Sequence, residues 1–543
     1  MKLKSVLVMV LAGLFLVACE DGGKGTPNIL EQTFNYNLSQ QPTTLNVLSS
    51  SDAYATRVQI YVVEGLAKRN IDTYEWEPAL ATKWDISEDG TTYTFTLREG
   101  VKWHDGKPLT AQDVKFSFDA IVDPENKYST AHMKPYYENI ESCEILEDGR
   151  IQFKVKNKYY GNFNVVAGLS VVPRHLYENP SEEQKKQLNK TLVGTGPYTL
   201  ENWKRGKYII LKKNPNWWGN TVYPKENNFE MIRMRFIKEG NIAIQRLENG
   251  DLDFNSMTAE EFTKKTQGEK WGKSVKKVKI ENLAPKGYTF IGWNLKNDLF
   301  KDRDIRLALY HLIDREKMIE KYDYGLTLPA IGPWYLQSMF ADKSVKPIPF
   351  DPKKALQILR KNGWKDTDGD QILDKVINGK KTPFRFTILE PLKEYTKYLV
   401  TFQQDAKKAG IDVQIKVVEW NTFITLLNER KFEAVRLAWG GGSVDLDPKQ
   451  IWHSSSSKSK GSNFVSYENP KVDKLIDQAR KMLKREERIP LLQEVYRTIA
   501  NDVPYAFLFN PKYGFYGYNE RMVREKDTYK YDVGLDHWKI QAK

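Results

Sequence analysis

Apolar and polar residues alternate along several short stretches of the chain, a pattern typical of half-buried β-strands. Residues 93–98 read Tyr-Thr-Phe-Thr-Leu-Arg and follow an Asp-Gly turn dipeptide. Further on, Val114, Phe118 and Ile121 recur at the spacing of one helix face. The pattern predicts a strand with one apolar face, followed by an amphipathic helix that Thr110 caps.

The same two periodicities recur in the second half of the chain. Residues 384–388 and 413–417 alternate as strands, and residues 395–406 between them carry apolar side chains at helical spacing. A strand, a helix and a strand in this order form a crossover unit, which implies parallel pairing. With 543 residues the chain exceeds one hydrophobic core, so we expect an α/β protein of at least two domains.

The first residues have the pattern of a targeting segment. Two lysines precede an apolar run over residues 6–17, which is too short to span a bilayer, since about 20 residues are needed. Leu16-Val17-Ala18-Cys19 fits a lipobox, whose cysteine is diacylated and becomes N-terminal. We expect a lipoprotein signal peptide over residues 1–18, and a lipidated Cys19 with a flexible tether over residues 19–27. A cleaved signal with an incidental cysteine is the alternative.

Composition argues against several classes of function. The 83 basic and 70 acidic residues give a net charge of +13, but the two signs are interspersed, so we interpret the excess as a solvated surface and expect no nucleic-acid partner. The six histidines show no metal-ligand spacing, and there is no nucleophile elbow or dinucleotide fingerprint. We therefore predict no enzyme activity, metal or cofactor. If Cys19 is lipidated, Cys143 has no disulfide partner.

Residues 80–121 as a whole resemble a known signature. The order Tyr-Thr-Phe-Thr-Leu-Arg-Glu-Gly-Val-Lys-Trp-His-Asp-Gly-Lys-Pro-Leu-Thr-Ala-Gln-Asp-Val is similar to the signature segment of family 5 extracellular solute-binding proteins. These are the oligopeptide, dipeptide and nickel receptors of ABC importers. Residues 193–198, 214–218 and 243–253 resemble other positions of the family. A tight turn also explains the first stretch, and we favour a structural role for the other two.

The resemblance implies a fold and a division of the chain. The fold is α/β and periplasmic-binding-protein type II-like, with two lobes of mixed sheets joined by hinge segments near 285 and 505, and an extra subdomain in the first lobe. The implied segments are 28–66, 194–285 and 506–543 for lobe I, 67–193 for its extra subdomain, and 286–505 for lobe II. The implied protein is a membrane-anchored monomer in the cell envelope or periplasm, which closes on its ligand and delivers it to a permease.

Two segments of lobe II resemble ligand-facing segments of oligopeptide receptors. In those relatives, tryptophans at the positions of Trp420 and Trp439 wall side-chain pockets, and an arginine at the position of Arg436 can meet a ligand carboxylate. A structural or surface ion pair is the equal alternative for Arg436. We also include Asn294, at the end of the predicted strand 288–294, in the predicted ligand site.

The second segment departs from the family pattern at Gly442. Peptide receptors carry an aspartate there, which pairs with the ligand's amino terminus. Asp445 could take over this role, whereas Asp447-Pro448 suits a turn. Peptide is therefore the expected ligand class. A nickel chelate, a sugar or an opine in the same transport role stays open, as does an envelope hydrolase that uses carboxylates of the cleft.

Residues 366–374 resemble a calcium-binding loop. The EF-hand pattern requires glycine at its sixth position and glutamate at its twelfth, and these positions hold Gln371 and Ile377. We interpret the stretch as an acidic turn. His104 lies within the signature segment, and we interpret it as a turn residue.

Overall fold

A computed structural model of the chain describes residues 31–541, apart from 51–52, 126, 129, 131–132 and 459–460. The expected signal peptide, Cys19 and the tether up to residue 27 lie outside the described residues. Within the described part of the chain, no helix combines the length and the apolar character that crossing a membrane requires.

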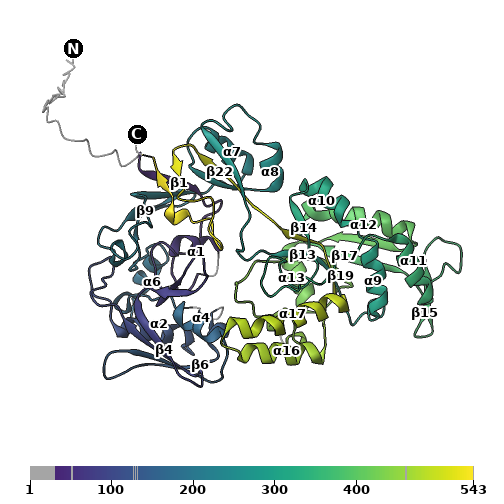
Figure 1. Cartoon of the computed structure of the whole chain (residues 1–543), viewed down its shortest axis with the longest axis horizontal. Coiled ribbons are helices and arrows are strands. Elements are labelled where there is room, and N and C mark those ends of the chain that lie inside the picture. The colour runs from purple at the N-terminus through teal and green to yellow at the C-terminus, as the bar shows by residue number, and fades with distance from the viewer. Residues whose placement is uncertain are drawn as a thin grey trace, which may run out of the picture.

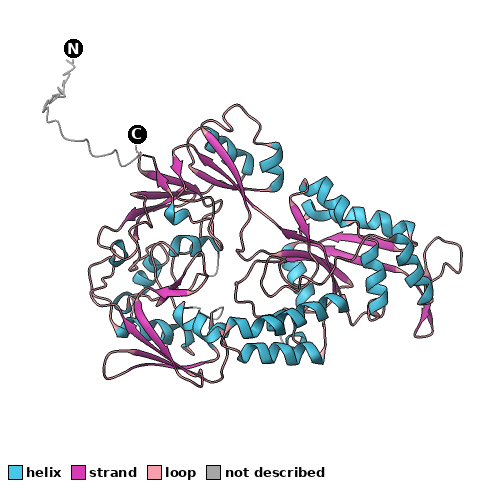
Figure 2. Ribbon diagram, in the orientation of Figure 1, coloured by secondary structure: helices cyan, strands magenta, loops and turns pink. Residues whose placement is uncertain are grey.

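Two lobes stand side by side, each built around a sheet of its own (Figures 1 and 2). The sheet of lobe I is mixed, because β1 pairs in parallel with β10 and β11 while the remaining pairs are antiparallel. In spatial order its strands are β12 (Val275–Ile280), β22 (Gly514–Asn519), β11 (Phe254–Met257), β1 (Thr33–Asn37), β10 (Met231–Arg235), β9 (Tyr208–Lys213) and β8 (Tyr198–Lys204). Around it lie α1 (Ala53–Gln59), η2 (Trp218–Asn220), α7 (Gly240–Glu248), α8 (Ala259–Lys264), η4 (Leu535–His537) and the pair β23 (Met522–Val523) and β24 (Lys539–Ile540).

Residues 67–193 add a smaller sheet to lobe I, with the strand order β4 (Ala81–Ile86), β5 (Thr92–Leu97), β7 (Ile151–Val155) and β6 (Ile140–Ile145). The predicted strand and helix of the signature segment are confirmed as β5 and α2 (Ala111–Val122), and Thr110 forms a capping box with Asp113. Phe95 of this sheet and Phe34 of β1 belong to one hydrophobic core, so the subdomain packs as part of lobe I. Its other elements are β2 (Ala67–Arg69), β3 (Trp76–Pro78), α3 (Lys134–Tyr137), α4 (Gly161–Ala167), α5 (Arg174–Tyr177) and α6 (Glu182–Leu188).

Lobe II has a five-stranded sheet in the order β18 (Asp412–Val417), β17 (Arg385–Glu390), β19 (Ala434–Trp439), β13 (Tyr288–Trp293) and β20 (Tyr505–Phe507). The predicted crossover unit is confirmed: β17 and β18 are parallel and α12 (Thr396–Lys408) connects them. The other elements of the lobe are α9 (Arg303–His311), α10 (Arg315–Asp323), α11 (Pro352–Lys361), η3 (Lys393–Tyr395), α13 (Trp420–Asn428), α14 (Lys449–Trp452), α15 (Ser455–Lys458), α16 (Pro470–Lys481), α17 (Arg485–Asp502), β14 (Thr327–Pro329), β15 (Asp374–Ile377), β16 (Lys380–Pro383) and β21 (Phe509–Pro511).

The chain crosses between the lobes twice, at residues 281–287 and at residues 512–513. The first crossing agrees in place with the expected hinge near 285. The second lies beyond the expected position near 505, because β20 pairs with β13 and β21 pairs with β14, both in lobe II. Residues 505–509 are all buried, so this apolar run stays with the lobe II core before the chain leaves it.

Motifs that carry the family resemblance meet at one point of lobe I. The Glu64 carboxylate accepts hydrogen bonds from the Thr195 hydroxyl and from the indoles of Trp217 and Trp218, at 2.8–3.0 Å. Burial raises the pKa of Glu64 to about 7, against the opposing effect of these hydrogen bonds. A Cβ atom at Gly194 would lie 1.8 Å from the Val62 carbonyl oxygen, so glycine is required there. These motifs therefore hold lobe I together.

Candidate functional site

The carboxyl ends of three neighbouring parallel strands of lobe II, β17, β18 and β19, lie at one edge of the sheet. Glu390, Val417 and Trp439 are the last residues of β17, β18 and β19, and Glu390 is in register with Val417. In open α/β sheets, ligands bind outside the carboxyl ends of the strands. A ligand site is therefore expected at this edge.

Trp439 lies at this edge, beside the first crossing between the lobes. Its ring stacks between those of Phe290 and Phe464, with centroids 6.2 and 5.8 Å away and planes inclined by 19° and 7°. A Cβ atom at Gly287 would lie 2.2 Å from the Trp439 carbonyl oxygen, and one at Gly441 would lie 2.2 Å from that of Pro285. The chain after Trp439 therefore runs against the segment that leads to lobe I.

Trp420 begins α13, three residues after β18 ends. Its ring centroid lies 6.0 Å from that of the fully buried Phe423, and 47% of the residue is exposed. Trp439 is also only partly buried. Both predicted tryptophans thus keep accessible surface, which a wall of a ligand pocket needs and a core residue would lack.

Arg436 is buried beneath this edge, and its Nε atom has no hydrogen-bond partner among the residues that the structure describes. The residue is 4% exposed, and its guanidinium carbon lies 3.9 Å from the centre of the Tyr395 ring. The Nε atom is 3.8 Å from Oε2 of Glu390, which is too far for a hydrogen bond. Neither atom has a hydrogen-bond partner, and no described residue accepts a hydrogen bond from this guanidinium.

The charge of Arg436 is only partly balanced by Glu390. Burial lowers the pKa of Arg436, while the charge of Glu390 opposes this effect. Burial raises the pKa of Glu390 to about 7, against the effect of Arg436. Near neutral pH a fraction of the Glu390 carboxyls is therefore protonated. Because a buried cation that its counter-charge balances only in part is costly, the arrangement favours an additional anion at Arg436. No sequence pattern identifies Glu390 or Tyr395 as site residues, apart from the charge of Glu390 at the end of a buried strand.

Asn294 is separated from this group. It follows β13, which is antiparallel to β19, so that Tyr288 pairs with Trp439 and the opposite end of β13 carries Asn294. The amide of Asn294 donates to the carbonyl oxygens of Phe432 and Arg430, at 2.8 and 3.2 Å. The Asn294 side chain therefore stabilises a turn at the opposite end of the sheet from Trp439. The sequence-based expectation had included it in the ligand site.

Gly442 lies on an open part of the loop after β19. It adopts a positive φ of 66°, and an added Cβ atom would meet nothing within 4 Å. A larger side chain at this position would have room, at the cost of left-handed backbone geometry.

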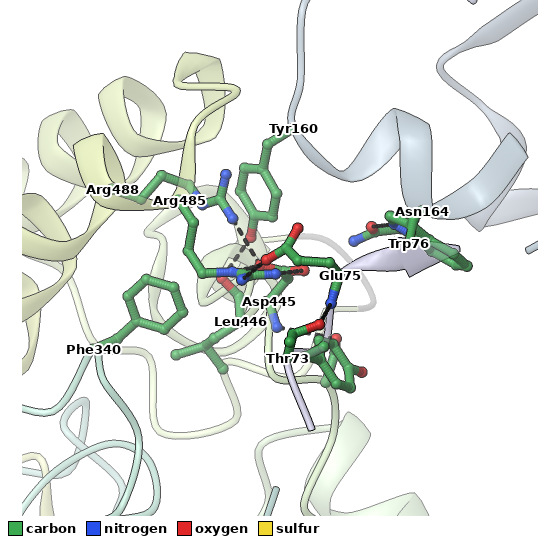
Figure 3. Close-up of polar contacts among 12 residues, drawn as sticks. Thr73, Glu75, Trp76, Tyr160, Asn164, Phe340, Asp445, Leu446, Arg485 and Arg488 are labelled. Atoms are coloured by element: carbon green, nitrogen blue, oxygen red, sulfur yellow. Dashed lines mark hydrogen bonds and ion pairs between the residues drawn. The ribbon is translucent and has the colours of Figure 1, made fainter. Parts of the chain in front are cut away.

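Three arginines bind the Asp445 carboxylate, and Figure 3 labels two of them, Arg485 and Arg488. Both carboxylate oxygens therefore already accept hydrogen bonds, and neither is free for a ligand ammonium. The Asp445 carboxylate accepts hydrogen bonds from Arg69, Arg485 and Arg488 at 2.8–3.3 Å. Burial alone would raise the pKa of Asp445, but the bond from Arg485 and the charges of the three arginines outweigh it and lower the pKa. The excess of positive charge disfavours a ligand ammonium here.

The acidic turn of residues 366–374 brings three carboxylates together. Oxygens of Asp366, Asp368 and Asp374 lie within 4.8 Å of one another. Lys381 Nζ lies 2.7 Å from Asp368 and 3.4 Å from Asp374, and Asp366 accepts hydrogen bonds from backbone amides of the turn. The carboxylates therefore already have a cation and turn amides as partners.

Two surface hollows lie elsewhere in lobe II. One, of about 780 Å³, is lined by residues that include Arg385 and Glu433, and the second, of about 760 Å³, by residues that include Gln371 and Gln403. The residues that line them include neither predicted tryptophan, and both hollows lie away from the carboxyl edge of the sheet. The buried guanidinium of Arg436, which has no hydrogen-bond acceptor among the described residues, makes the edge the stronger candidate.

Two lobes with mixed sheets, joined by two crossings, define a type II periplasmic-binding-protein fold. The family model described as bacterial extracellular solute-binding proteins, family 5 Middle, matches residues 75–462, and the chain belongs to this family. The oligopeptide-binding protein AppA of Bacillus subtilis (strain 168) is 31% identical over 515 residues, covering 92% of this chain and 89% of AppA.

Solved structures agree with the assignment. The structure of AppA from Bacillus subtilis in complex with a nonapeptide superposes with a TM-score of 0.72 at 29% identity, covering 94% of this chain and 99% of that one. The structure of NikZ from Campylobacter jejuni in complex with Ni(L-His) gives 0.73 at 25% identity, with coverage of 94% and 99%. Both relatives bind solutes, one a peptide and the other a metal chelate.

Proposed function

We propose that the protein is the solute-binding component of an ABC importer for peptides, which it captures between its two lobes and delivers to a membrane permease. The observation that carries the proposal is the buried guanidinium of Arg436 at the carboxyl edge of the lobe II sheet, for which the described part of the chain provides no hydrogen-bond acceptor. The similarity to oligopeptide-binding AppA supports the peptide class.

In this proposal the ligand's carboxylate is the group that the site recognises. A guanidinium binds a carboxylate through two parallel hydrogen bonds. The N–H donors of Arg436 have no acceptor among the described residues and could make these bonds. Trp439 and Trp420 provide the apolar walls for neighbouring side chains. The loop at Gly442 leaves open space where an incoming chain can pass.

In this proposal the ligand's amino terminus is not recognised through an aspartate at position 442, as the resemblance to peptide receptors would imply. Gly442 offers no carboxylate, and Asp445 is saturated by arginines. Affinity therefore depends more on the carboxyl end of the ligand than on its ammonium group. This predicts that N-acetylated peptides bind about as well as free ones.

A metal chelate is the second candidate ligand. NikZ, at 25% identity, was solved with Ni(L-His), and a histidine carboxylate would suit the same guanidinium. In this alternative the chelating amino acid carries the metal.

The test combines native mass spectrometry with calorimetry. Native mass spectrometry of protein purified from cells without refolding gives the mass of any ligand that co-purifies. Calorimetry then measures binding of a peptide, its amide, its N-acetyl form and Ni(L-His). Co-purified peptides, with loss of affinity on amidation, support the proposal. A bound metal complex with no affinity for any peptide would overturn it.

The membrane anchor is a separate part of the proposal and rests on the Leu16-Val17-Ala18-Cys19 sequence. A diacylated Cys19 would hold the protein at the outer face of a membrane, near its permease. In cell fractionation the wild type should sediment with membranes, and Cys19→Ser should not. Equal distribution of the two proteins would contradict lipidation at this residue.

A further inference from the structure

The two lobes also meet far from the crossings, where α4 lies beside α16 and α17 (Figure 1). The facing residues are polar or aromatic and come from β2, the turn before β3 and the start of α4 on one side. On the other side they come from the loop after β19 and from α16 and α17. We call this contact the clasp; it consists of Arg69, Glu75, Tyr159 and Tyr160 of lobe I with Asp445, Leu446, Asp447, Arg480, Arg485 and Arg488 of lobe II.

The centre of the clasp is the Asp445 carboxylate (Figure 3). It lies 3.0 Å from Arg69 Nη2, 2.9 Å from Arg485 Nε and 2.8 Å from Arg488 Nη2. Arg485 and Arg488 belong to lobe II, as Asp445 does, and only Arg69 reaches across from lobe I. The side chain of Asp445 is 5% exposed and that of Arg69 is 18% exposed. One buried carboxylate thus accepts from both lobes.

Hydrogen bonds around this centre also cross between the lobes. Arg485 Nη1 donates to Glu75 at 2.6 Å. The hydroxyl of Tyr160 donates to the Leu446 carbonyl oxygen at 2.5 Å, and that of Tyr159 donates to Asp447 at 2.7 Å. The contact is therefore continuous from β2 to α4.

Arg69 is held in place without help from lobe II. It donates to the Tyr74 carbonyl oxygen at 2.6 Å and to Asn164 Oδ1 at 2.7 Å. Its guanidinium also lies 3.9 Å from the Trp76 ring centre. The arginine that crosses between the lobes is thus fixed before the lobes meet, which reduces the entropy lost when it binds Asp445.

The clasp is polar, whereas each lobe has a separate hydrophobic core. Contacts of this kind between domains resemble transient interfaces, and motion of the domains is expected where they break. Their ionic part weakens as salt rises, because the Debye length falls from about 10 Å at 0.1 M to about 3 Å at 1 M.

We propose that the clasp holds the two lobes together in the ligand-free protein, with Asp445 as its central acceptor. Every partner belongs to the chain, so the contact needs no ligand. Asp445 accordingly serves lobe closure, while Arg436 and the two tryptophans serve the ligand. The inference does not depend on which ligand the protein carries.

The experiment measures the radius of gyration of the ligand-free protein by small-angle X-ray scattering, after native mass spectrometry has verified that no ligand is bound. Arg69→Met removes the arm from lobe I, and Asp445→Asn removes the central charge. Asp477→Asn is the matched control, because Asp477 pairs with Lys449 and His453 inside lobe II. Circular dichroism confirms that each variant is folded.

We expect the radius of gyration to increase for Arg69→Met and Asp445→Asn and to stay at the wild-type value for Asp477→Asn. In wild type it should increase between 0.1 and 1 M NaCl, and in the two clasp variants this salt dependence should be lost. Equal radii for wild type and both clasp variants would overturn the proposal. So would an increase confined to Asp445→Asn, since the aspartate would then act only within lobe II, or an increase shared by the control.

Discussion

Replacing Arg436 by methionine should weaken the binding of peptides with a free carboxyl terminus far more than that of the same peptides as amides. Hydrogen bonds to charged groups contribute about 1.5–3 kcal/mol each, and this corresponds to about 10- to 150-fold in the dissociation constant. The upper part of the range is expected, because Arg436 is 4% exposed and water screens it little.

The substitution also disturbs the protein itself. Removing Arg436 leaves the Glu390 carboxyl without the cation 3.8 Å away. The pKa of Glu390, already about 7, should rise further, so that the carboxyl takes up a proton near neutral pH. The double variant Arg436→Met with Glu390→Gln removes both charges. It should recover stability relative to the single variant while the loss of affinity persists.

Isothermal titration calorimetry on wild type and variant, each with the free peptide and its amide, gives a thermodynamic cycle. The expected coupling between Arg436 and the terminal carboxylate is about 3 kcal/mol, at the upper end of the range for hydrogen bonds to charged groups. A coupling near zero would refute the assignment, because Arg436 would then act on both peptides alike and serve only the structure of lobe II.

Three further predictions follow from single positions. Position 442 has open space around it, so Gly442→Asp should make the protein bind peptides with a free amino terminus more tightly than N-acetylated ones in calorimetry. The control Gly442→Asn should show no such preference, and equal preference in both variants would contradict this. The pKa of folded Glu390, about 7 against an ordinary 4.5, means that its burial lowers stability progressively as pH rises from about 4.5 to 7, by about 3 kcal/mol in total. Glu390→Gln should remove that dependence in urea unfolding of lobe II, and an unchanged slope would show that the carboxyl is not buried as described. Gly194→Ala places a Cβ atom 1.8 Å from a carbonyl oxygen and should lower the free energy of unfolding by about 1–3 kcal/mol. Gly440→Ala, whose Cβ atom meets nothing within 4 Å, should leave it unchanged, and similar melting temperatures for the two variants would contradict the close approach.

Local elements were predictable because their signals lie in neighbouring residues. The alternation over residues 93–98 and the helical spacing after Thr110 became β5 and α2 at nearly the expected bounds. The crossover unit in lobe II was equally readable, since two alternating stretches flanked one amphipathic helix. The second crossing was placed too early, because the sequence cannot show that residues 505–507 pair with β13.

The candidate site was only partly predictable. Arg436 lies within β19, Trp439 ends that strand, and Trp420 follows β18; strand periodicity together with the family resemblance placed all three in the predicted site. Asn294 was included because it also ends a strand, but β13 runs antiparallel to β19 and carries Asn294 to the other end. Strand direction is a property of the sheet and leaves no mark on a single strand's sequence.

The sequence by itself determined the α/β class, several strands and helices, and the family, because these depend on spacing over a few residues and on a long ordered motif. Only the tertiary structure decided which charges meet. Asp445 is 376 positions from Arg69 along the chain. No local sequence pattern distinguishes a carboxylate that binds a ligand from one that joins two lobes. The physical reason is that the partner of a buried charge is set by the packing of distant segments, whereas turns and periodicities are set by adjacent ones.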